Sequence, residues 1–448
     1  MPKILVIGVG AAGNKAAINL IEKDVMRKED VLLVNSSKTD IKNLSNDEST
    51  YMDCYVNLYE GVDGCAKERK AAGQMTLSAF AKDTLDLKTK LLKNGYEKVI
   101  LVTSIEGGTG SGSTPIIADM IKREINDNKK LPNINIEIVA FKGFGKDIVG
   151  LKNSVNFFND LNKYLGKNYT LQIICNELFL KEARNQLEAQ KMANDEFAQR
   201  VRILSGQLLN NGNDNNCSNI IDGSDLFRYT CAPGYSTVEY IEITDKIVSK
   251  DDYNDLINKM IDSSKSPSIS ESSESQEDMR TKYFKVSVIA NIQNSSRNYV
   301  DYDNNVIRER FGEIIEMYDQ FYSDPNKPEF VALILRGLKR PSDIIIDMGE
   351  EYQKRTKNIN TFEDDYDEAL KSMESIIDDD DDFDMIKNMR VFNTSPQPAD
   401  TKVSDDFLNS FRVEKNEDDL EIELSKNKKK KSIKSNNILI TPTDESDF

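Results

Sequence analysis

The stretch that decides the fold is Glu106-Gly107-Gly108-Thr109-Gly110-Ser111-Gly112-Ser113, which joins two segments of regular pattern. Before it runs KVILVTS, from Lys98, an apolar segment typical of a buried strand, and after it runs PIIADMIKREI, from Pro115, with helical spacing. Four glycines with hydroxyl side chains between them can present successive backbone N–H groups to phosphate oxygens. The stretch lacks the lysine of a Walker P-loop, and a flexible turn without a ligand is disfavoured directly between a strand and a helix. It predicts a phosphate-binding site.

A second glycine-rich stretch, Gly8-Val9-Gly10-Ala11-Ala12-Gly13, follows the first apolar run and opens an alanine-rich helical pattern. It fits G-x-G-x-x-G, whose glycines let the backbone approach phosphates at a helix N-terminus. A Rossmann dinucleotide site would place an acidic residue about 20 positions later, at the end of the second strand. That strand ends instead in Asn35-Ser36-Ser37. An NAD site is therefore weakened but stays an alternative, beside a tight turn that binds nothing.

Further apolar runs predict the rest of a sheet. They occur at Val31–Asn35, Ile134–Phe141 and Leu171–Asn176, and helical stretches separate them. Strands that are apolar nearly throughout indicate a parallel sheet buried on both faces, whose ligands bind at the carboxyl ends of the strands. The predicted fold class is therefore α/β.

The second half of the chain changes pattern. A helical stretch, roughly Lys181 to Leu209, is followed by strand-like runs from Tyr283 and Pro328, with VIRERFGEIIEMYDQFY between them as a helix. These elements predict a second, smaller α/β domain. The serine- and acid-rich segment from Ser263 is typical of a disordered insertion.

The tail carries most of the charge. From Thr361 to Phe448 there are 24 acidic against 12 basic residues, in a chain of net charge −17. Such a composition buries too little apolar surface to fold alone, so we expect a disordered arm. It contains an acidic block, Asp378 to Asp382, and a basic block, Lys428 to Lys431. The arm either recruits partners or only keeps the protein in solution.

The composition excludes several kinds of chemistry. The 448 residues contain no histidine, which excludes histidine-based nucleophilic catalysis and histidine-ligated metals. The five cysteines lack paired spacings, which indicates reduced thiols. No apolar run approaches the roughly 20 residues of a membrane-spanning helix, and no secretory signal opens the chain, so we expect a cytoplasmic protein without membrane contact.

The two glycine-rich stretches and the segments after them resemble the tubulin/FtsZ family, whose signature loop is G-G-G-T-G-S/T-G. The resemblance extends to about Tyr235. VNSSKTDI, from Val34, is similar to the family's second nucleotide loop. GVDGCAKERKAA, from Gly61, is similar to the third loop, which senses the γ-phosphate. KGFGKDIVG, from Lys142, is similar to the fifth loop. Asn176 and Asn194 match the asparagines that read guanine. The resemblance implies GTP and Mg²⁺ as cofactors and a GTPase activity that depends on assembly.

IIDGSDLFRYTCAPGY, from Ile220, resembles the family's catalytic loop N-x-D-x-x-D and the helix after it. Asp222 and Asp225 retain the two acids, and at this spacing they can project from one face and orient water. In the family such acids act on the GTP of the neighbouring subunit. Taken alone, the pair is more typical of an ordinary helix N-cap.

Several positions depart from the family pattern. Ala11 and Ala12 replace glycines, Val149 or a displaced Asp147 replaces the ribose-binding glutamate, Asn153 replaces an arginine, Gln190 replaces the aromatic residue that stacks on guanine, and Ile220 replaces the catalytic asparagine. These departures make the chain most similar to the plasmid- and phage-encoded branch of TubZ and the phage tubulins, whose filaments position or segregate DNA. The helix predicted after Pro341, with Ser342 as its N-cap, is similar in place to the long C-terminal helix of that branch.

The resulting prediction is a GTP-dependent, filament-forming protein whose partners are further copies of itself and, through the tail, an adaptor on DNA. An FtsZ-like division scaffold and an NAD-dependent oxidoreductase stay as alternatives. The predicted regions are a parallel-sheet GTP-binding domain (1–180), a central helix with the catalytic loop (181–235), a smaller C-terminal α/β domain (236–360) with a disordered insertion near 263–280, and a disordered tail (361–448). The predicted catalytic acids are Asp222 and Asp225; the predicted nucleotide contacts are Gly8, Gly10, Ala11, Ala12, Asn14, Gly107, Gly108, Thr109, Gly110, Ser111, Gly112, Asp147, Asn153, Asn176 and Asn194, and no residue is predicted to ligate a metal directly.

Overall fold

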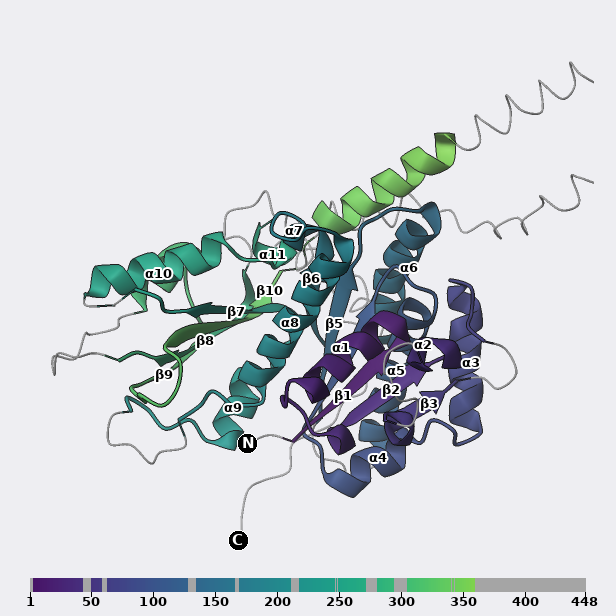
Figure 1. Cartoon of the computed structure of the whole chain (residues 1–448), viewed down its shortest axis with the longest axis horizontal. Coiled ribbons are helices and arrows are strands. Elements are labelled where there is room, and N and C mark those ends of the chain that lie inside the picture. Colours follow the sequence, from purple (N-terminus) through teal and green to yellow (C-terminus); the bar gives the residue numbers. More distant parts are fainter. Residues whose placement is uncertain are drawn as a thin grey trace, which may run out of the picture. The chain divides into compact units, whose positions relative to one another are not determined.

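One ten-stranded sheet runs through the computed structural model in the order β3-β2-β1-β4-β5-β6-β7-β10-β8-β9 (Figure 1). The two pairings that β10 makes, with β7 and β8, are antiparallel, and the other pairings of the described strands are parallel. The strands are β1 (Ile4–Val9), β2 (Val31–Asn35), β3 (Tyr55–Asn57), β4 (Lys98–Ser104), β5 (Asn135–Lys142), β6 (Thr170–Cys175), β7 (Gly234–Glu242), β8 (Arg280–Asn291), β9 (Glu316–Tyr322) and β10 (Phe330–Leu338).

The structure describes residues 3–42, 50–58, 63–127, 134–165, 169–210, 217–245, 247, 249–270, 280–293, 304–339, 341 and 343–358. All of these residues belong to one unit, Met1–Asp379. The predicted tail from residue 361, with its acidic and basic blocks, and the predicted N-cap Ser342 lie outside the described residues.

The predicted α/β class and the parallel sheet are confirmed. β2 and β4 have the bounds expected from the sequence, and β1, β5 and β6 differ from them by one or two residues. Every residue of β1, β2 and β6 is buried, as apolar strands covered on both faces must be. The short edge strand β3 and the strand β7, which is parallel to β6 and antiparallel to β10, were not predicted.

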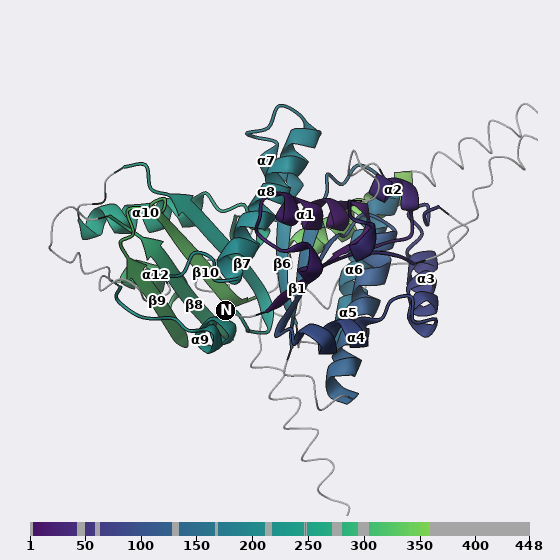
Figure 2. The same cartoon turned by 60° about the horizontal axis from the view of Figure 1, so that its bottom comes forward.

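Helices cover the parallel strands (Figures 1 and 2). α1 (Gly10–Glu22) packs against α8 (Gln186–Leu204), while α5 (Thr109–Asp127) packs against α3 (Arg69–Ala81) and α6 (Ile148–Leu165). The remaining short helices are α2 (Lys38–Lys42), α4 (Leu87–Asn94), α7 (Asn176–Phe179), α9 (Gly223–Tyr229), α10 (Lys250–Asp262), α11 (Pro267–Ser270) and α12 (Asn305–Phe311), with single 3₁₀ turns at Lys28–Asp30 and Met52–Cys54.

The two halves of the sheet meet at a short junction. β6 and β7 pair through Thr170–Gly234 and Leu171–Tyr235. The predicted GTP-binding and C-terminal regions therefore share one sheet in this structure. Fully buried side chains reinforce the junction, since the Glu137 carboxylate on β5 lies 2.6 Å from the Arg336 Nη1 on β10.

Lys98 on β4 completes this buried cluster. Its Nζ lies 2.9 Å from Glu137 Oε2 and donates to the Thr230 carbonyl at the end of α9. Burial alone would raise the pKa of Glu137, but the cations of Arg336 and Lys98 outweigh it and hold that pKa at about 2. Breaking such a cluster on one side would leave an uncompensated buried charge.

Three expectations for the second half are corrected. Residues Glu316–Tyr322, expected as the end of a helix, form β9, because EMYDQFY pairs in parallel with β8 and the preceding helix α12 stops at Phe311 before Gly312. The central helix α8 spans 19 residues and is shorter than expected. Residues 263–270 of the expected disordered insertion are folded: Ser264 and Ser266 are buried and α11 follows. Residues 271–279 lie outside the described part.

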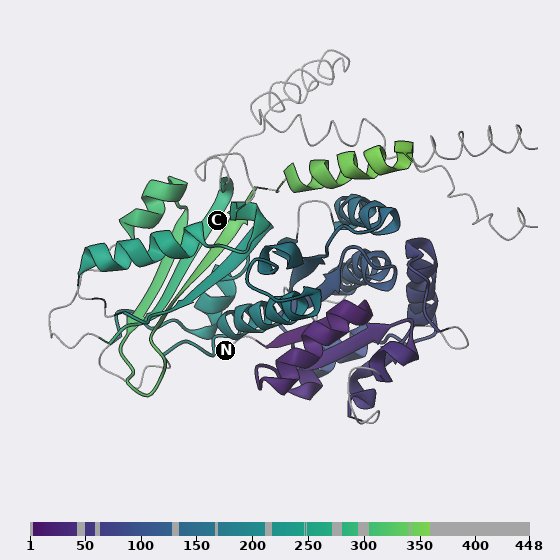
Figure 3. The ribbon, with the colours of Figure 1, turned by 45° about the horizontal axis from the view of Figure 1, so that its top comes forward.

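The predicted helix after Pro341 is present over residues 343–358. It lies beside α6 in Figure 3, where it is the light green helix. Ile344, Ile345 and Met348 of its first half are buried. Among the described residues, no helix is long and apolar enough to cross a membrane.

Candidate functional site

Two helix N-termini lie side by side at the carboxyl edge of the parallel strands. α1 begins at Gly10 directly after β1, and α5 begins at Thr109, five residues after the end of β4, which pairs with β1. The structure therefore places most of both glycine-rich stretches in the first turns of helices. Helix N-termini combine free N–H groups with a partial positive charge, which favours phosphate. The N-cap of α1, Val9, supplies no side-chain cap, and Ala11 and Ala12 of its first turn are partly exposed.

Glycines allow these two helices to approach closely. Gly10 has φ +74°, and a Cβ placed on it would lie 2.8 Å from the backbone nitrogen of Gly110. A Cβ on Gly8 would lie 2.7 Å from the Gly13 carbonyl oxygen, and one on Gly13 would collide with the Val102 carbonyl of β4. A Cβ on Gly107, by contrast, would meet no described atom within 4 Å. Gly107 therefore borders open space, whereas Gly8, Gly10 and Gly13 are needed for close packing of the backbone.

At the start of α5 a side chain replaces a backbone hydrogen-bond donor that the helix lacks. Pro115 lies inside the helix and has no N–H, so the carbonyl four residues earlier, at Ser111, loses its helical partner. Arg69, at the start of α3, donates from Nη2 to that carbonyl at 2.9 Å and is itself paired with Asp160. Sequence reasoning missed Arg69, although Pro115 four residues after Ser111 was a usable signal.

Thr109 connects the second and third predicted loops to the glycine stretch. Its hydroxyl lies 2.7 Å from the Ser36 hydroxyl, just after β2, and 3.2 Å from the Cys65 sulfur. The Gly64 N–H donates to the Ser36 carbonyl. Segments predicted to surround one nucleotide are thus brought together, and Ser36 and Cys65 join the site although neither was predicted individually.

The third loop lies directly on the glycine stretch. Ala66 and Lys67 have φ of +49° and +64°, a left-handed conformation that is costly for residues other than glycine. A Cβ on Gly108 would lie 2.5 Å from the Lys67 backbone, so glycine is required there. Lys67 Nζ lies 2.6 Å from Asp147 Oδ2, and this hydrogen bond lowers the pKa of Asp147.

Asn153 holds these loops together. From α6 its Nδ2 lies within 3.1 to 3.3 Å of the carbonyls of Lys67, Glu106 and Gly107. The residue predicted as a nucleotide contact therefore fixes the backbone around Gly107 in this structure. Glu106 was not predicted. Its carboxylate accepts from the Gly145 N–H in the fifth loop, and burial raises its pKa.

Two buried carboxamides have polar atoms without partners. Asn14, in α1, is fully buried, and neither Oδ1 nor Nδ2 finds a hydrogen bond among the described residues. Asn176 follows β6 at the same edge of the sheet, and its Oδ1 is also unpaired within the described structure. An unpaired buried amide costs free energy, which a polar ligand would recover. Asn194, the second predicted base contact, is half-buried on α8, where its carbonyl accepts from Asn19 of α1.

The predicted catalytic acids lie at the opposite edge. Asp222 and Asp225 cap α9, with Asp222 Oδ1 accepting from the Asp225 N–H at 2.8 Å and Asp225 Oδ2 accepting in return. The end of α9 bonds to Lys98 at the amino end of β4, whereas the glycine stretch follows the carboxyl end. The seven residues of β4 alone put roughly 20 Å between these ends. Asp222 is exposed and Asp225 is half-buried, so both are accessible to another molecule.

The donors at the glycine edge suit a nucleotide better than a bare metal ion. Within the described ranges, no three carboxylate or thiol side chains lie close enough together to hold a metal. The edge offers the uncapped start of α1, the open side of Gly107 and the unpaired amide of Asn14. These groups fit a phosphate chain and a polar base, and hydroxyls such as those of Ser36 and Thr109 fit a hydrated Mg²⁺ carried by the phosphates.

Comparison with known proteins finds a family match over the first part of the chain. Residues 3–181 match the tubulin/FtsZ family, GTPase domain. The tubulin-like protein TubZ of Clostridium botulinum C phage is 26% identical over 195 residues, which are 43% of this chain and 50% of TubZ. The tubulin-like protein CetZ3 of Haloferax volcanii is 22% identical over 246 residues, 54% of this chain and 60% of CetZ3. The chain thus spans half to three fifths of the length of these relatives.

Solved structures share the fold. A GTPγS-form protofilament of Bacillus thuringiensis serovar israelensis TubZ superposes with a TM-score of 0.61 at 16% identity, covering 81% of this chain and 94% of TubZ. The GDP-bound monomer of CetZ1 from Haloferax volcanii gives 0.59 at 18% identity, covering 78% of this chain and 99% of CetZ1. At these identities the likeness concerns the fold.

Proposed function

Because residues 3–181 form a tubulin/FtsZ GTPase domain, we propose that this protein binds GTP with Mg²⁺ and hydrolyses it between subunits of its own filament. One observation carries the proposal: the acids Asp222 and Asp225 and the glycine helix starts lie at opposite edges of one sheet. Both sets cannot act on the same nucleotide within one chain. A second copy stacked head to tail would bring its acids to the first copy's phosphates.

In such a contact different residues of this chain would bind the phosphates, bind the base or ribose, and orient the attacking water. Backbone N–H groups at the starts of α1 and α5 would hold the phosphates, with Mg²⁺ neutralising their charge. Asn14 and Asn176 would pair with polar atoms of the base or ribose, which their unpaired atoms favour. Asp222 and Asp225 of the neighbour would orient the attacking water. Gln190, at the position where the family stacks an aromatic residue on guanine, is exposed on α8 and offers no ring.

The experiment is the GTP turnover per subunit as a function of protein concentration. We expect turnover to rise steeply where the protein begins to assemble, seen by light scattering and by electron microscopy with GTP, GDP and a slowly hydrolysed analogue. Turnover that is flat from dilute to concentrated protein contradicts hydrolysis between subunits. A binding isotherm with GTP against NAD(H) separates the proposal from an oxidoreductase. Asn35, at the end of β2, donates to Asp40 and offers no carboxylate to a ribose, which favours GTP.

The cellular role is a finer proposal. We infer that the filaments move or segregate DNA, with the tail beyond residue 361 binding an adaptor through its basic block; a division scaffold of the FtsZ type is the alternative. The sequence alone supports this part. Truncation at Arg390 removes the basic block, and truncation at Asn360 removes both blocks. Loss of DNA or adaptor binding at the first truncation supports recruitment by the basic block, and unchanged binding in both contradicts it.

A further inference from the structure

We propose that Arg355, on the helix over 343–358, is a positioning residue that slows nucleotide release by fixing the fifth loop of the site. The inference rests on the proposed function. Arg355 comes from a part of the chain more than 200 residues away from that loop, and no sequence motif marks it.

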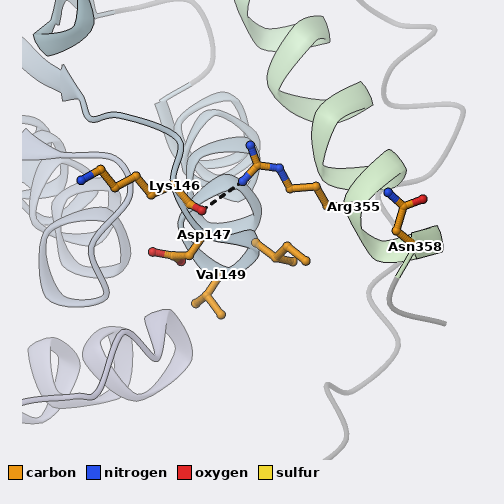
Figure 4. A pocket seen from close by; sticks show the side chains of 6 residues that line it. Lys146, Asp147, Val149, Arg355 and Asn358 are labelled. Atoms are coloured by element: carbon orange, nitrogen blue, oxygen red, sulfur yellow. Dashed lines mark hydrogen bonds between the residues drawn. The ribbon is translucent and has the colours of Figure 1, made fainter. Parts of the chain in front are cut away.

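The guanidinium holds two consecutive carbonyls of the loop. Arg355 Nη1 donates to the carbonyl oxygens of Gly145 and Lys146, both at 3.0 Å. Figure 4 shows the bond to Lys146. Its Nε lies 2.6 Å from Glu351 Oε1, one turn earlier on the same helix. The pairing with Glu351 fixes the direction of the guanidinium, so that both loop carbonyls are held by a preoriented donor.

This contact lies beside an open cavity at the end of the helix. An open cavity of about 440 Å³ separates the last turn of the helix from the loop and is lined by Lys146, Asp147, Ile148, Val149, Arg355 and Asn358. The first half of the helix, in contrast, buries Ile344, Ile345 and Met348. Arg355 thus joins the loop to the last turn of this helix by two hydrogen bonds beside this cavity.

The loop passes this constraint to the glycine stretch. Gly145, with φ +58°, donates its N–H to Glu106 Oε1 at 3.1 Å, and Glu106 directly precedes Gly107. A Cβ on Gly143 would collide with the same carboxylate. A displacement of the loop backbone would therefore move Glu106, and with it the open cradle at Gly107.

The loop also reaches the third loop of the site. Asp147 Oδ1 accepts from the Gly150 N–H at 2.7 Å and so caps the start of α6, while Oδ2 pairs with Lys67 Nζ. The Lys67 backbone lies against Gly108. Arg355 on one side and Lys67 on the other thus hold the loop against the place where the phosphates are proposed to lie.

The test is the dissociation rate of a fluorescent guanine nucleotide from the full chain, below the concentration at which it assembles. We expect Arg355→Ala to release the nucleotide about five to ten times faster, because two hydrogen bonds from a charged donor are lost. Arg355→Lys, which can donate to one of the carbonyls, should recover part of the retention. Lys354→Ala removes a neighbouring exposed cation of the same helix and is the matched control.

An equal rate in Arg355→Ala and the wild type overturns the inference, as does an equal acceleration by Lys354→Ala. A fall in melting temperature with an unchanged release rate would show a structural role alone and overturns it too. If the wild-type chain binds guanine nucleotide but the variant releases it at the same rate, the inference fails and the proposed function stands. If the wild-type chain binds none, both fail.

Discussion

Gly10 and Gly110 belong to different strand-to-helix connections, yet a single methyl group on Gly10 would come within 2.8 Å of the Gly110 nitrogen. The starts of α1 and α5 are therefore in backbone contact. Two helix N-termini at this separation could both stabilise one anionic ligand, because the partial charge of each acts within about one turn. The close approach explains why both stretches are rich in glycine although most of these residues are helical.

The glycines of the second stretch should divide into two classes on substitution. Gly107→Ala places its methyl group in open space, so we expect the melting temperature of the free protein to change little while GTP binding weakens, because the methyl enters the phosphate cradle. Gly108→Ala forces a contact of 2.5 Å with the Lys67 backbone and should destabilise the fold by about 1 to 3 kcal/mol. Thermal unfolding with and without GTP measures both effects. Tight GTP binding by Gly107→Ala would contradict a phosphate position beside Gly107.

Asn14 should stabilise the complex and destabilise the free protein. Its amide is fully buried and unpaired within the described structure, so Asn14→Leu should leave the free protein as stable as the wild type or more so. The same change removes donors and acceptors for the nucleotide and should weaken GTP binding by about 1 to 3 kcal/mol. Unfolding curves over a range of GTP concentration give both numbers. Equal GTP stabilisation of variant and wild type would show that Asn14 does not face the ligand.

The sequence predicted the two glycine-rich connections between strand and helix, but it did not predict the unpaired, buried state of Asn14 among the described residues. The glycine pattern identified both connections, because glycine is needed wherever backbones touch and that need is visible residue by residue. The unpaired state of Asn14 depends on what surrounds the side chain and has no local signal. Arg69, Lys67, Glu106 and Arg355 act through contacts across 39 to 210 positions of sequence, which no spacing rule reveals.

Asp225→Ala should leave GTP binding unchanged and slow hydrolysis by about two decades at concentrations where the wild type assembles, since one water-orienting charge is lost. The measurement is phosphate release together with the lifetime of the filaments. The same change opens the capping box of α9, which costs about 1 kcal/mol of stability.

The structure offers a matched control for that cap. α10 begins with an equivalent capping box, Ser249 with Asp252, 27 positions after that of α9. Asp252→Ala should show a comparable loss of stability with normal hydrolysis. Similar GTPase rates in the two variants would make Asp225 a helix cap and nothing more.

The stability of the free protein should fall as the pH rises from about 4.5 to 7. Burial raises the pKa of Glu239 on β7 to about 7, although Arg200 opposes the shift and Glu196 adds to it. Its Oε1 accepts from the hydroxyls of Thr237 and Ser264. Between the ordinary pKa of 4.5 and about 7 the folded chain holds a proton that the unfolded chain has lost, so the stabilisation present at low pH disappears, by up to about 3 kcal/mol.

Glu239→Gln keeps the acceptor oxygen and removes the titration. Urea unfolding at a series of pH values should therefore give a flatter profile for the variant and a more stable protein at pH 7.5. Glu137 does not confuse the comparison, because its pKa of about 2 places its own loss of stability below pH 4.5. Parallel profiles for variant and wild type would contradict the prediction.

The failure to predict β9 has a physical cause. EMYDQFY carries apolar residues at spacings that suit either a helix or a half-buried strand, and a short segment cannot distinguish the two periods. The segment forms a strand because it pairs with β8, whose residues lie about 30 positions earlier in the chain. Local pattern was sufficient for β2 and β4 because each contains a run of four apolar, buried residues, Val31–Val34 and Val99–Val102.

The brief pairing of β6 with β7 has a mechanical consequence. Tension applied between the two ends of a subunit has to cross from one half of the sheet to the other. At this seam the strand ladder contributes only two residue pairs, beside buried links such as that from Glu137 to Arg336, whereas the ladders on either side are longer. Elastic deformation concentrates where the fewest bonds resist it. A subunit pulled or bent within the proposed filament would therefore bend along this line first. The angle between the end that carries Asp222 and Asp225 and the end that carries the glycine helix starts would then change with the load.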